Sequence, residues 1–210
     1  MKTKIGVIGN GNVGGALERG LTRAGFEVQS TGKDDAAVRR IGAWADTILL
    51  AVPYVALPET LRALGPLDGK VVVDATNALT PDFQLAVGFT TSGAEELQRA
   101  VPTARVVKAF NTIFAQHMDS GRVKEQRLTA LVAGDDADAR KHVAALASAI
   151  GFDPVDAGPL RNARWLESLG YLNIQLGYVL GMGPDIGFTL VHRRGRRARQ
   201  NVRRVGLVTQ

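Results

Sequence analysis

The pattern of apolar positions near the start of the chain changes from the period of a strand to the period of a helix. Residues 3–8 form a short run of β-formers. Apolar residues then recur at helical spacing from Val13 to Ala24, and Gly25 follows them. The pattern therefore predicts a strand, a tight turn rich in glycine and an amphipathic helix that ends at Gly25.

The same alternation of short apolar runs and amphipathic stretches continues along most of the chain. Further strands are predicted at residues 26–30, 45–52, 69–74, 104–109, 128–133 and 152–156. Further helices are predicted at residues 36–41, 55–64, 92–101 and 135–150. Alternating strands and helices are typical of a parallel sheet with helices on both faces. The expected fold class is α/β, a doubly wound, Rossmann-type and mostly parallel sheet over residues 1–158.

The pattern changes from Pro159 onward. Residues 160–180 read as one long helix, and few charged residues follow Glu167 in it. An apolar helix face of this kind needs to be covered. Packing against a second copy of the chain explains it, and packing on the chain's own sheet is the alternative. We therefore expect residues 159–190 to form a small C-terminal helical extension that dimerises and contacts substrate.

Local capping signals support two of the predicted helices. Asp34 and Asp35 precede the helix at residues 36–41 and are interpreted as N-caps. Ser92, with Glu95 three residues later, forms a capping-box pattern. The stretch before it, residues 79–91, is interpreted as a loop of the length often associated with function.

Composition excludes several classes of site. The chain has no cysteine, so disulfides, thiolate metal sites and cysteine nucleophiles are ruled out. Its three histidines, His117, His142 and His192, have no spacing that suggests a metal site or a catalytic triad. No run of 18 apolar residues is present. We expect a soluble, cytoplasmic protein that binds no metal and no membrane.

The positive charge is concentrated at the C-terminus. The net charge is +6, and residues 191–210 contain seven arginines and no acidic residue. Residues 1–190 are therefore almost neutral. A nucleic-acid partner is not expected for this part, whereas the basic tail at residues 191–210 could bind polyanions by counterion release. A solvated tail or a helix extension is the alternative, because no aromatic residue is interleaved for base stacking.

The first predicted turn carries the G-x-G-x-x-G spacing of a dinucleotide-binding site. The first glycine permits the tight turn, the second lets a pyrophosphate approach the backbone, and the third lets the helix pack on the strand. The helix would direct its unpaired N–H groups and positive dipole end at the phosphates. The candidate cofactor-binding residues here are Gly9, Asn10, Gly11, Asn12, Val13 and Gly14.

The end of the second strand indicates which dinucleotide is bound. An NAD site usually has an acidic residue there for the adenosine ribose, whereas a 2′-phosphate needs a cation and small polar donors. The residues present are Thr31, Gly32 and Lys33, which favour NADP. Lys33 is the candidate phosphate contact, and an ordinary solvated loop lysine is the alternative interpretation.

Ligands of doubly wound sheets lie beyond the carboxyl ends of the strands. Residues at these ends that should border the dinucleotide are Val52, Pro53, Tyr54 and Asn77. Asp74 is interpreted as a structural acceptor rather than a general base. Lys108 and His117 are the candidate catalytic residues, although a strand-end lysine with a structural partner and an ordinary helix position are the alternative interpretations.

Six motifs together resemble those of the coenzyme F420-dependent NADP oxidoreductase family. In order they are Gly9–Gly14, Asp74-Ala-Thr-Asn77, Val106–Ile113, Val132–Asp136, Asp156–Leu160 and Gly181-Met-Gly183. The similarity extends from residue 3 to about residue 190. The second and third motifs are also similar to the cytosolic reductase domain of the six-transmembrane metalloreductases, which pass electrons from NADPH to flavin.

The resemblance implies a Rossmann-type reductase that transfers a hydride between NADP(H) and a deazaflavin, coenzyme F420, or a related flavin. It also implies a homodimer. The pyrophosphate would lie on the glycine turn, and the residues implied to face the second ring are Asn111, Ile113, Phe114, Met182 and Gly183. For hydride transfer between stacked rings, the protein chiefly has to bring the two rings close together and orient them.

Two alternatives stay open at this stage. A reductase of a small imine or carbonyl would need a placed proton donor, for which Lys108 and Tyr54 are the candidates. A non-catalytic protein that binds NADP, or polyanions through the arginine tail, is the other.

Overall fold

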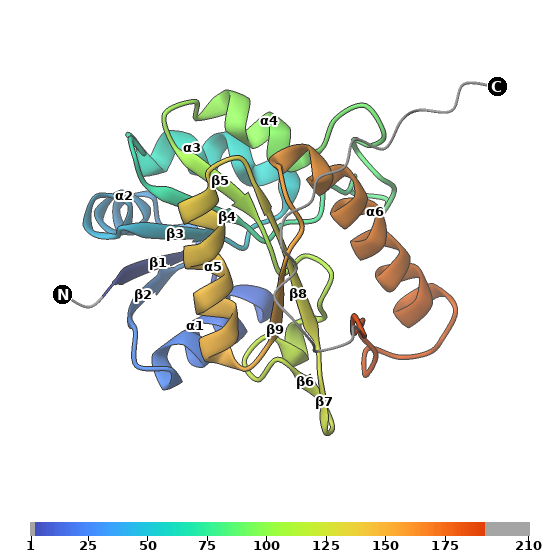
Figure 1. Cartoon of the computed structure of the whole chain (residues 1–210). Coiled ribbons are helices and arrows are strands. Elements are labelled where there is room, and N and C mark those ends of the chain that lie inside the picture. Colours follow the sequence, from blue (N-terminus) through green and yellow to red (C-terminus); the bar gives the residue numbers. More distant parts are fainter. Residues whose placement is uncertain (1–2, 192–210) are drawn as a thin grey trace, which may run out of the picture.

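A seven-stranded sheet organises the protein in the computed structural model, which describes residues 3–191 (Figure 1). Its strands, in spatial order, are β2 (Glu27–Thr31), β1 (Lys4–Ile8), β3 (Thr47–Leu50), β4 (Val71–Asp74), β5 (Arg105–Lys108), β8 (Thr129–Gly134) and β9 (Asp153–Asp156). The first five are mutually parallel, whereas β8 pairs with β5 in the antiparallel sense and β9 is parallel to β8. The expected mostly parallel α/β sheet is confirmed.

Helices cover both faces of this sheet. One face packs against α1 (Asn12–Arg23) and α5 (Ala137–Ile150). The other face packs against α2 (Asp35–Trp44), α3 (Leu57–Leu64), which follows a 3₁₀ turn at Tyr54–Ala56, and α4 (Gly93–Ala100). Alternate residues of each strand enter the two apolar layers, because successive side chains of a strand point to opposite faces. The cores thus hold the ends of the strands in fixed positions.

Side chains cap three of these helices. Asp34 accepts a hydrogen bond from the Ala37 amide, Ser92 accepts one from the Glu95 amide, and Asp136 accepts one from the Ala139 amide. The caps expected at Asp34 and Ser92 are confirmed. At the start of α1 the N-cap is a glycine, which provides no side-chain acceptor.

The connection between β5 and β8 differs from the simple strand–helix alternation. It contains a 3₁₀ turn at Ala115–His117 and a hairpin of two short strands, β6 (Arg122–Val123) and β7 (Gln126–Arg127). Two-residue strands are too short to show a hydrophobic period, so the sequence gives no signal for them. Because this connection lacks the crossover helix that parallel neighbours usually require, β8 returns antiparallel to β5.

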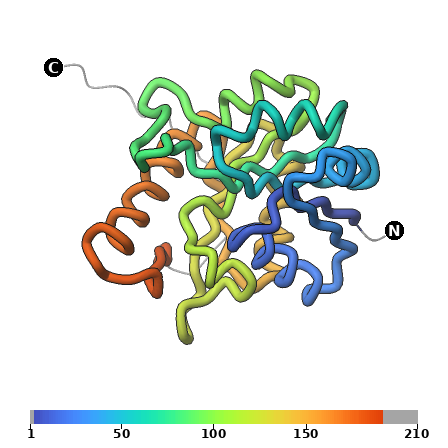
Figure 2. Tube along the Cα trace, turned by 180° about the vertical axis from the view of Figure 1, so that it is seen from behind, coloured from blue at the N-terminus to red at the C-terminus, as the bar shows by residue number. Residues whose placement is uncertain are grey.

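The C-terminal segment is divided into three parts rather than forming one regular helix. A 3₁₀ turn at Leu160–Asn162 leads into α6 (Ala163–Ile174), which passes into a π-helical turn at Gln175–Val179. Gly177 packs so tightly on Phe114 that a Cβ there would lie 2.6 Å from Phe114 Cζ. Figure 2 shows this segment on the side of the molecule away from β1 and β2. In residues 3–191, no helix has the length and apolar character needed to cross a membrane.

Candidate functional site

The glycine turn after β1 is closed by close backbone contacts. Gly9 has φ +107°, and a Cβ on it would lie 2.2 Å from the Ala51 carbonyl oxygen. A Cβ on Gly14 would lie 1.6 Å from the Gly9 carbonyl oxygen. Gly11 differs, because no atom lies within 4 Å of its Cβ position. Two of the glycines are therefore required by the fold itself, whereas Gly11 faces free space.

The amino end of α1 lies at one wall of a cleft of about 510 Å³. Asn10, Gly11 and Asn12 form this wall, and Gln116 and Tyr178, from two other elements, also line the cleft. No side chain caps the first N–H groups of α1, and its first turn contains no acidic residue. Uncapped N–H groups at the positive end of a helix dipole are suited to an anion such as a pyrophosphate. The residues present therefore fit a dinucleotide.

The end of β2 lies beside the glycine turn. Thr31 pairs with Ile8 across the two strands, and the Gly9 amide donates to the Thr31 carbonyl oxygen at 2.8 Å. Gly32 lies against Asn10, whose Oδ1 would be 2.8 Å from a Cβ at Gly32. Lys33 is exposed at the same turn. The structure thus brings together the two segments that the sequence assigns to the pyrophosphate and the 2′-phosphate.

Tyr54, which opens the 3₁₀ turn after β3, is directed toward α4. Its hydroxyl donates to Glu96, and its ring lines a small apolar pocket of about 240 Å³ between α3 and α4. Burial, together with the hydrogen bond to Glu96, raises the pKa of Tyr54, so the phenol stays protonated. Val52, two residues earlier, does lie beside the turn, with Cγ1 3.3 Å from the Cβ position of Gly9.

Asn77 and Asn111 meet at the ends of β4 and β5. Asn111 Nδ2 donates to Asn77 Oδ1 at 3.3 Å and to the Leu166 carbonyl oxygen of α6 at 2.8 Å. Gly170 of α6 lies directly on this pair, because a Cβ there would be 2.7 Å from both side chains. The amides that were predicted to contact cofactor and substrate are therefore neighbours, and α6 covers them.

The loop after β5 meets the π-helical turn through two aromatic rings. Phe114 and Tyr178 lie edge to face with ring centroids 5.2 Å apart. Phe114 and its neighbour Ile113 are buried, whereas Met182 is 59% exposed. The Gly183 amide donates to the Gly177 carbonyl oxygen at 3.0 Å. These contacts place the Gly181–Gly183 turn next to Phe114, one of the predicted second-ring residues in the loop after β5.

His117 is held by the C-terminal segment. Its Nε2 is 3.1 Å from the Pro184 carbonyl oxygen and 3.6 Å from Asp185 Oδ1. The residue is buried at the end of the 3₁₀ turn after β5. Within residues 3–191, no cluster of three metal-ligating side chains occurs. The geometry gives His117 a packing partner, and its catalytic role stays a prediction.

Lys108 lies in a fully buried ionic cluster. Its Nζ is 3.0 Å from Asp74 Oδ2, 2.9 Å from Glu167 Oε1 and 2.8 Å from the Thr76 carbonyl oxygen. Burial alone lowers the pKa of Lys108, but the charges of Asp74 and Glu167 outweigh it and raise that pKa above its usual range. An ammonium has three N–H donors, and here each has an acceptor. The cluster agrees with the structural interpretation of both Asp74 and Lys108.

Four residues that sequence reasoning missed belong to this region. Arg19, Gln116 and Tyr178 line the cleft, and Glu167 joins the buried cluster. Only Glu167 carried a signal, because an isolated acid in an apolar helix is almost never fully buried unless it is paired. The other three reach the cleft through tertiary contacts that no local pattern reports.

Comparison with known proteins identifies relatives for the whole fold. No family model matches the chain. Metalloreductase STEAP3 from Rattus norvegicus is 27% identical over 179 residues, which cover 79% of this chain and 36% of that protein. The chain thus spans about a third of the length of the curated relatives that it matches.

Solved structures extend the comparison. A protein of Arthrobacter sp. FB24, named as an F420-dependent NADP reductase, superposes with a TM-score of 0.81 at 28% identity, covering 90% of this chain and all of that one. An imine reductase from Pseudomonas sp. superposes with a TM-score of 0.62 at 18% identity, covering 86% of this chain and 64% of that one, a likeness of fold alone. The chain therefore has the fold of the Rossmann-type NADP-binding reductases, and its resemblance to the coenzyme F420-dependent NADP oxidoreductase family is confirmed.

Proposed function

We propose that this protein is an NADPH-dependent oxidoreductase that transfers a hydride between NADP(H) and a flat-ring acceptor, coenzyme F420 or a flavin. Residues 1–158 would bind NADP, and residues 159–190 would close the acceptor side and form the dimer contact. The nicotinamide supplies the hydride when it is bound. The chain's own residues would bind, orient and shield the two rings.

The observation that carries this proposal is the cleft between the glycine turn and the loop after β5. Its one wall offers the uncapped N–H groups of α1, and its other wall contains Gln116 and Tyr178. A dinucleotide on the first wall would extend toward the aromatic pair of Phe114 and Tyr178. Two flat rings stacked there need little from the protein except proximity and orientation.

The candidate proton donors have structural partners, which supports a ring acceptor over an imine or carbonyl. Each N–H of Lys108 has an acceptor inside the buried cluster. The Tyr54 hydroxyl donates to Glu96, beside the pocket between α3 and α4. Reduction of an imine or carbonyl needs a donor within hydrogen-bond reach of the substrate.

Spectrophotometry tests the acceptor directly. Purified protein with NADPH should bleach oxidised F420 or FMN, and a Gly11→Ala variant should show much weaker turnover with the same acceptor. Absence of turnover with both acceptors would exclude this function. Turnover of cyclic imines that is lost in Tyr54→Phe would favour the alternative reductase, whereas loss in Lys108→Ala would not, because that change also breaks the buried cluster.

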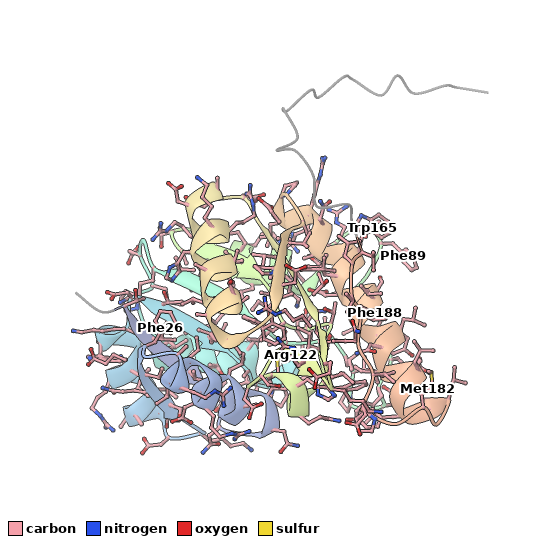
Figure 3. All side chains as sticks on the ribbon, turned by 60° about the horizontal axis from the view of Figure 1, so that its bottom comes forward. Phe26, Phe89, Arg122, Trp165, Met182 and Phe188 are labelled. Carbon is pink, nitrogen blue, oxygen red and sulfur yellow. The ribbon has the colours of Figure 1, made fainter. Side chains whose placement is uncertain are left out.

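We also propose that the outer face of the C-terminal helical segment is the homodimer contact. Exposed apolar side chains follow one another along it, among them Trp165, Leu172, Val179 and Leu180. Figure 3 shows Trp165 near its start and Met182 beyond its end, both on the outer side of the molecule. Analytical ultracentrifugation should find a dimer that Trp165→Glu converts to a monomer. A wild-type monomer at high concentration would contradict this assignment.

A further inference from the structure

Glu167 of α6 joins three elements that lie far apart in the sequence. Its side chain is 3% exposed. Oε2 accepts from the Gly93 amide at 2.9 Å, and Oε1 accepts from the Ala94 amide at 3.1 Å and lies 2.9 Å from Lys108 Nζ. One carboxylate therefore connects α6 to the first turn of α4 and to the end of β5.

The partners of Glu167 leave α6 little freedom to slide or rotate. The buried cluster contains two carboxylates and one ammonium, and the amino end of α4 adds a partial positive charge. Charges out of contact with water are tolerated only when they are paired and hydrogen-bonded. A shift of α6 by one turn would break the buried ion pair between Glu167 and Lys108. The cluster thus favours a single register of α6 on the sheet.

The same face of α6 contacts the residues after β5. Gly170 and Asn173 follow Glu167 at intervals of three, and residues so spaced share a helix face. Gly170 packs on Asn111, and Asn173 Nδ2 donates to the Thr112 carbonyl oxygen at 3.2 Å. Asn111 also donates to the Leu166 carbonyl oxygen. The register of α6 therefore determines how the Asn111–Phe114 loop is held.

A second ion pair joins the same two helices and provides a matched control. Arg164 of α6 makes two contacts with Glu95 of α4, from Nε at 2.9 Å and from Nη2 at 2.6 Å. Both side chains are partly exposed, and the ion pair itself includes no residue of β5. This outer pair links α6 to α4 without fixing α6 against the strand that leads into the acceptor side.

We propose that Glu167 is a positioning residue for hydride transfer, which sets the register of α6 against β5 and thereby the orientation of the Asn111–Phe114 loop. The proposal rests on the function proposed above. The close contacts of the glycine turn are with the start of α1, the end of β2 and the residues after β3. Loss of Glu167 should therefore impair the acceptor side far more than NADPH binding.

Three variants test this role. Glu167→Gln keeps the shape and removes the charge, Glu167→Asp keeps the charge and shortens the reach, and Arg164→Gln removes the outer pair. Each is compared with wild type by amide hydrogen exchange of residues 93–94 and 163–174, by the Kd for NADPH from fluorescence, and by kcat/KM for oxidised F420, or for FMN if only FMN is turned over.

Glu167→Gln should accelerate exchange in α6 and lower kcat/KM for the acceptor, each by about tenfold or more, with the Kd for NADPH changed by less than about threefold. Arg164→Gln should change all three by less than about threefold. Glu167→Asp should fall between wild type and Glu167→Gln in α6 exchange, and it replaces Glu167→Gln if the latter does not fold.

Two results would overturn the proposal. The first is a Glu167 variant that matches Arg164→Gln in exchange and turnover. The second is a loss of NADPH affinity as large as the loss of kcat/KM, since this would indicate a general loss of structure. If wild type reduces neither F420 nor FMN, the proposed function fails, and the exchange comparison still decides whether Glu167 holds the register of α6.

Discussion

The two walls of the cleft are built in opposite ways. The wall at the glycine turn is made by backbone, and its shape depends on the absence of Cβ atoms at Gly9 and Gly14. The wall formed by the loop after β5 and the C-terminal segment includes Gln116 and Tyr178, and polar side-chain contacts of Asn111 and Lys108 join α6 to the strand that leads into this loop. The first wall depends on close backbone packing and the second on polar contacts between side chains. Mutations in one wall should therefore leave the structure of the other wall largely intact.

Breaking the buried cluster should strongly destabilise the protein. Lys108→Met leaves the carboxylates of Asp74 and Glu167 buried without a cation, which should cost about 3–5 kcal/mol of unfolding free energy. Urea unfolding measures this cost. The control Lys33→Met changes an exposed lysine and should cost almost nothing. A Lys108→Met protein as stable as wild type would mean that the second wall does not depend on this cluster.

Adding a methyl group at the glycine turn should affect binding and spare the fold. Gly11→Ala meets no atom within 4 Å, so the melting temperature should stay near that of wild type. The Kd for NADPH should nevertheless rise by about tenfold or more, because the added Cβ occupies space proposed for the pyrophosphate. Fluorescence titration measures the Kd. Gly14→Ala is the contrasting variant and should unfold or aggregate, since its Cβ would clash with the Gly9 carbonyl. Unchanged NADPH affinity in Gly11→Ala would contradict the pyrophosphate assignment.

At the first wall, a smaller effect on affinity should distinguish NADPH binding from NADH binding. Lys33→Ala removes the exposed cation at the end of β2 and should weaken NADPH binding roughly fivefold, with little change for NADH. Parallel titrations with both dinucleotides measure the ratio. The control Lys124→Ala removes a lysine from the β6–β7 turn and should leave the ratio unchanged. An equal loss for both dinucleotides in Lys33→Ala would remove the reason for assigning NADP.

The smallest effect on stability is expected at the amino ends of the strands, away from both walls of the cleft. His142 is hydrogen-bonded to Thr47 at 2.9 Å, and burial, followed by the charge of Arg105, lowers the pKa of His142 below its usual 6.5, against the opposing charge of Asp46. The unfolded chain therefore binds this proton at a higher pH than the native chain. Stability from His142 should be present above about pH 6.5 and fall as the pH drops toward 5.

Melting temperatures from pH 7.5 to 5 in wild type and His142→Gln test this dependence. The variant should lose less stability over the range than wild type does. Equal slopes in the two proteins would show that His142 does not contribute to the pH dependence.

The sequence predicts the wall at the glycine turn better than it predicts the wall formed by the loop after β5 and the C-terminal segment. The strand, turn and helix at residues 3–25 follow from period and glycine spacing, and the structure has them within a residue or two. The caps at Asp34 and Ser92 are predictable for the same reason, because each side chain bonds an amide only three residues later. By contrast, the π-helical turn depends on the fit of Gly177 against Phe114, which lies far away in the sequence. Tyr54 comes after β3 and opens a 3₁₀ turn, and the direction of its hydroxyl depends on Glu96 of α4.

The sequence alone determined the alternating strands and helices, the glycine turn and the family resemblance, because each depends on spacing within a few residues. Tertiary structure alone decided the antiparallel return of β8, the capping of α4 by Glu167 and the assembly of the cleft from the glycine turn, Gln116 and Tyr178. These contacts join residues dozens of positions apart, and their energies come from burial and charge pairing that exist only after the chain has folded.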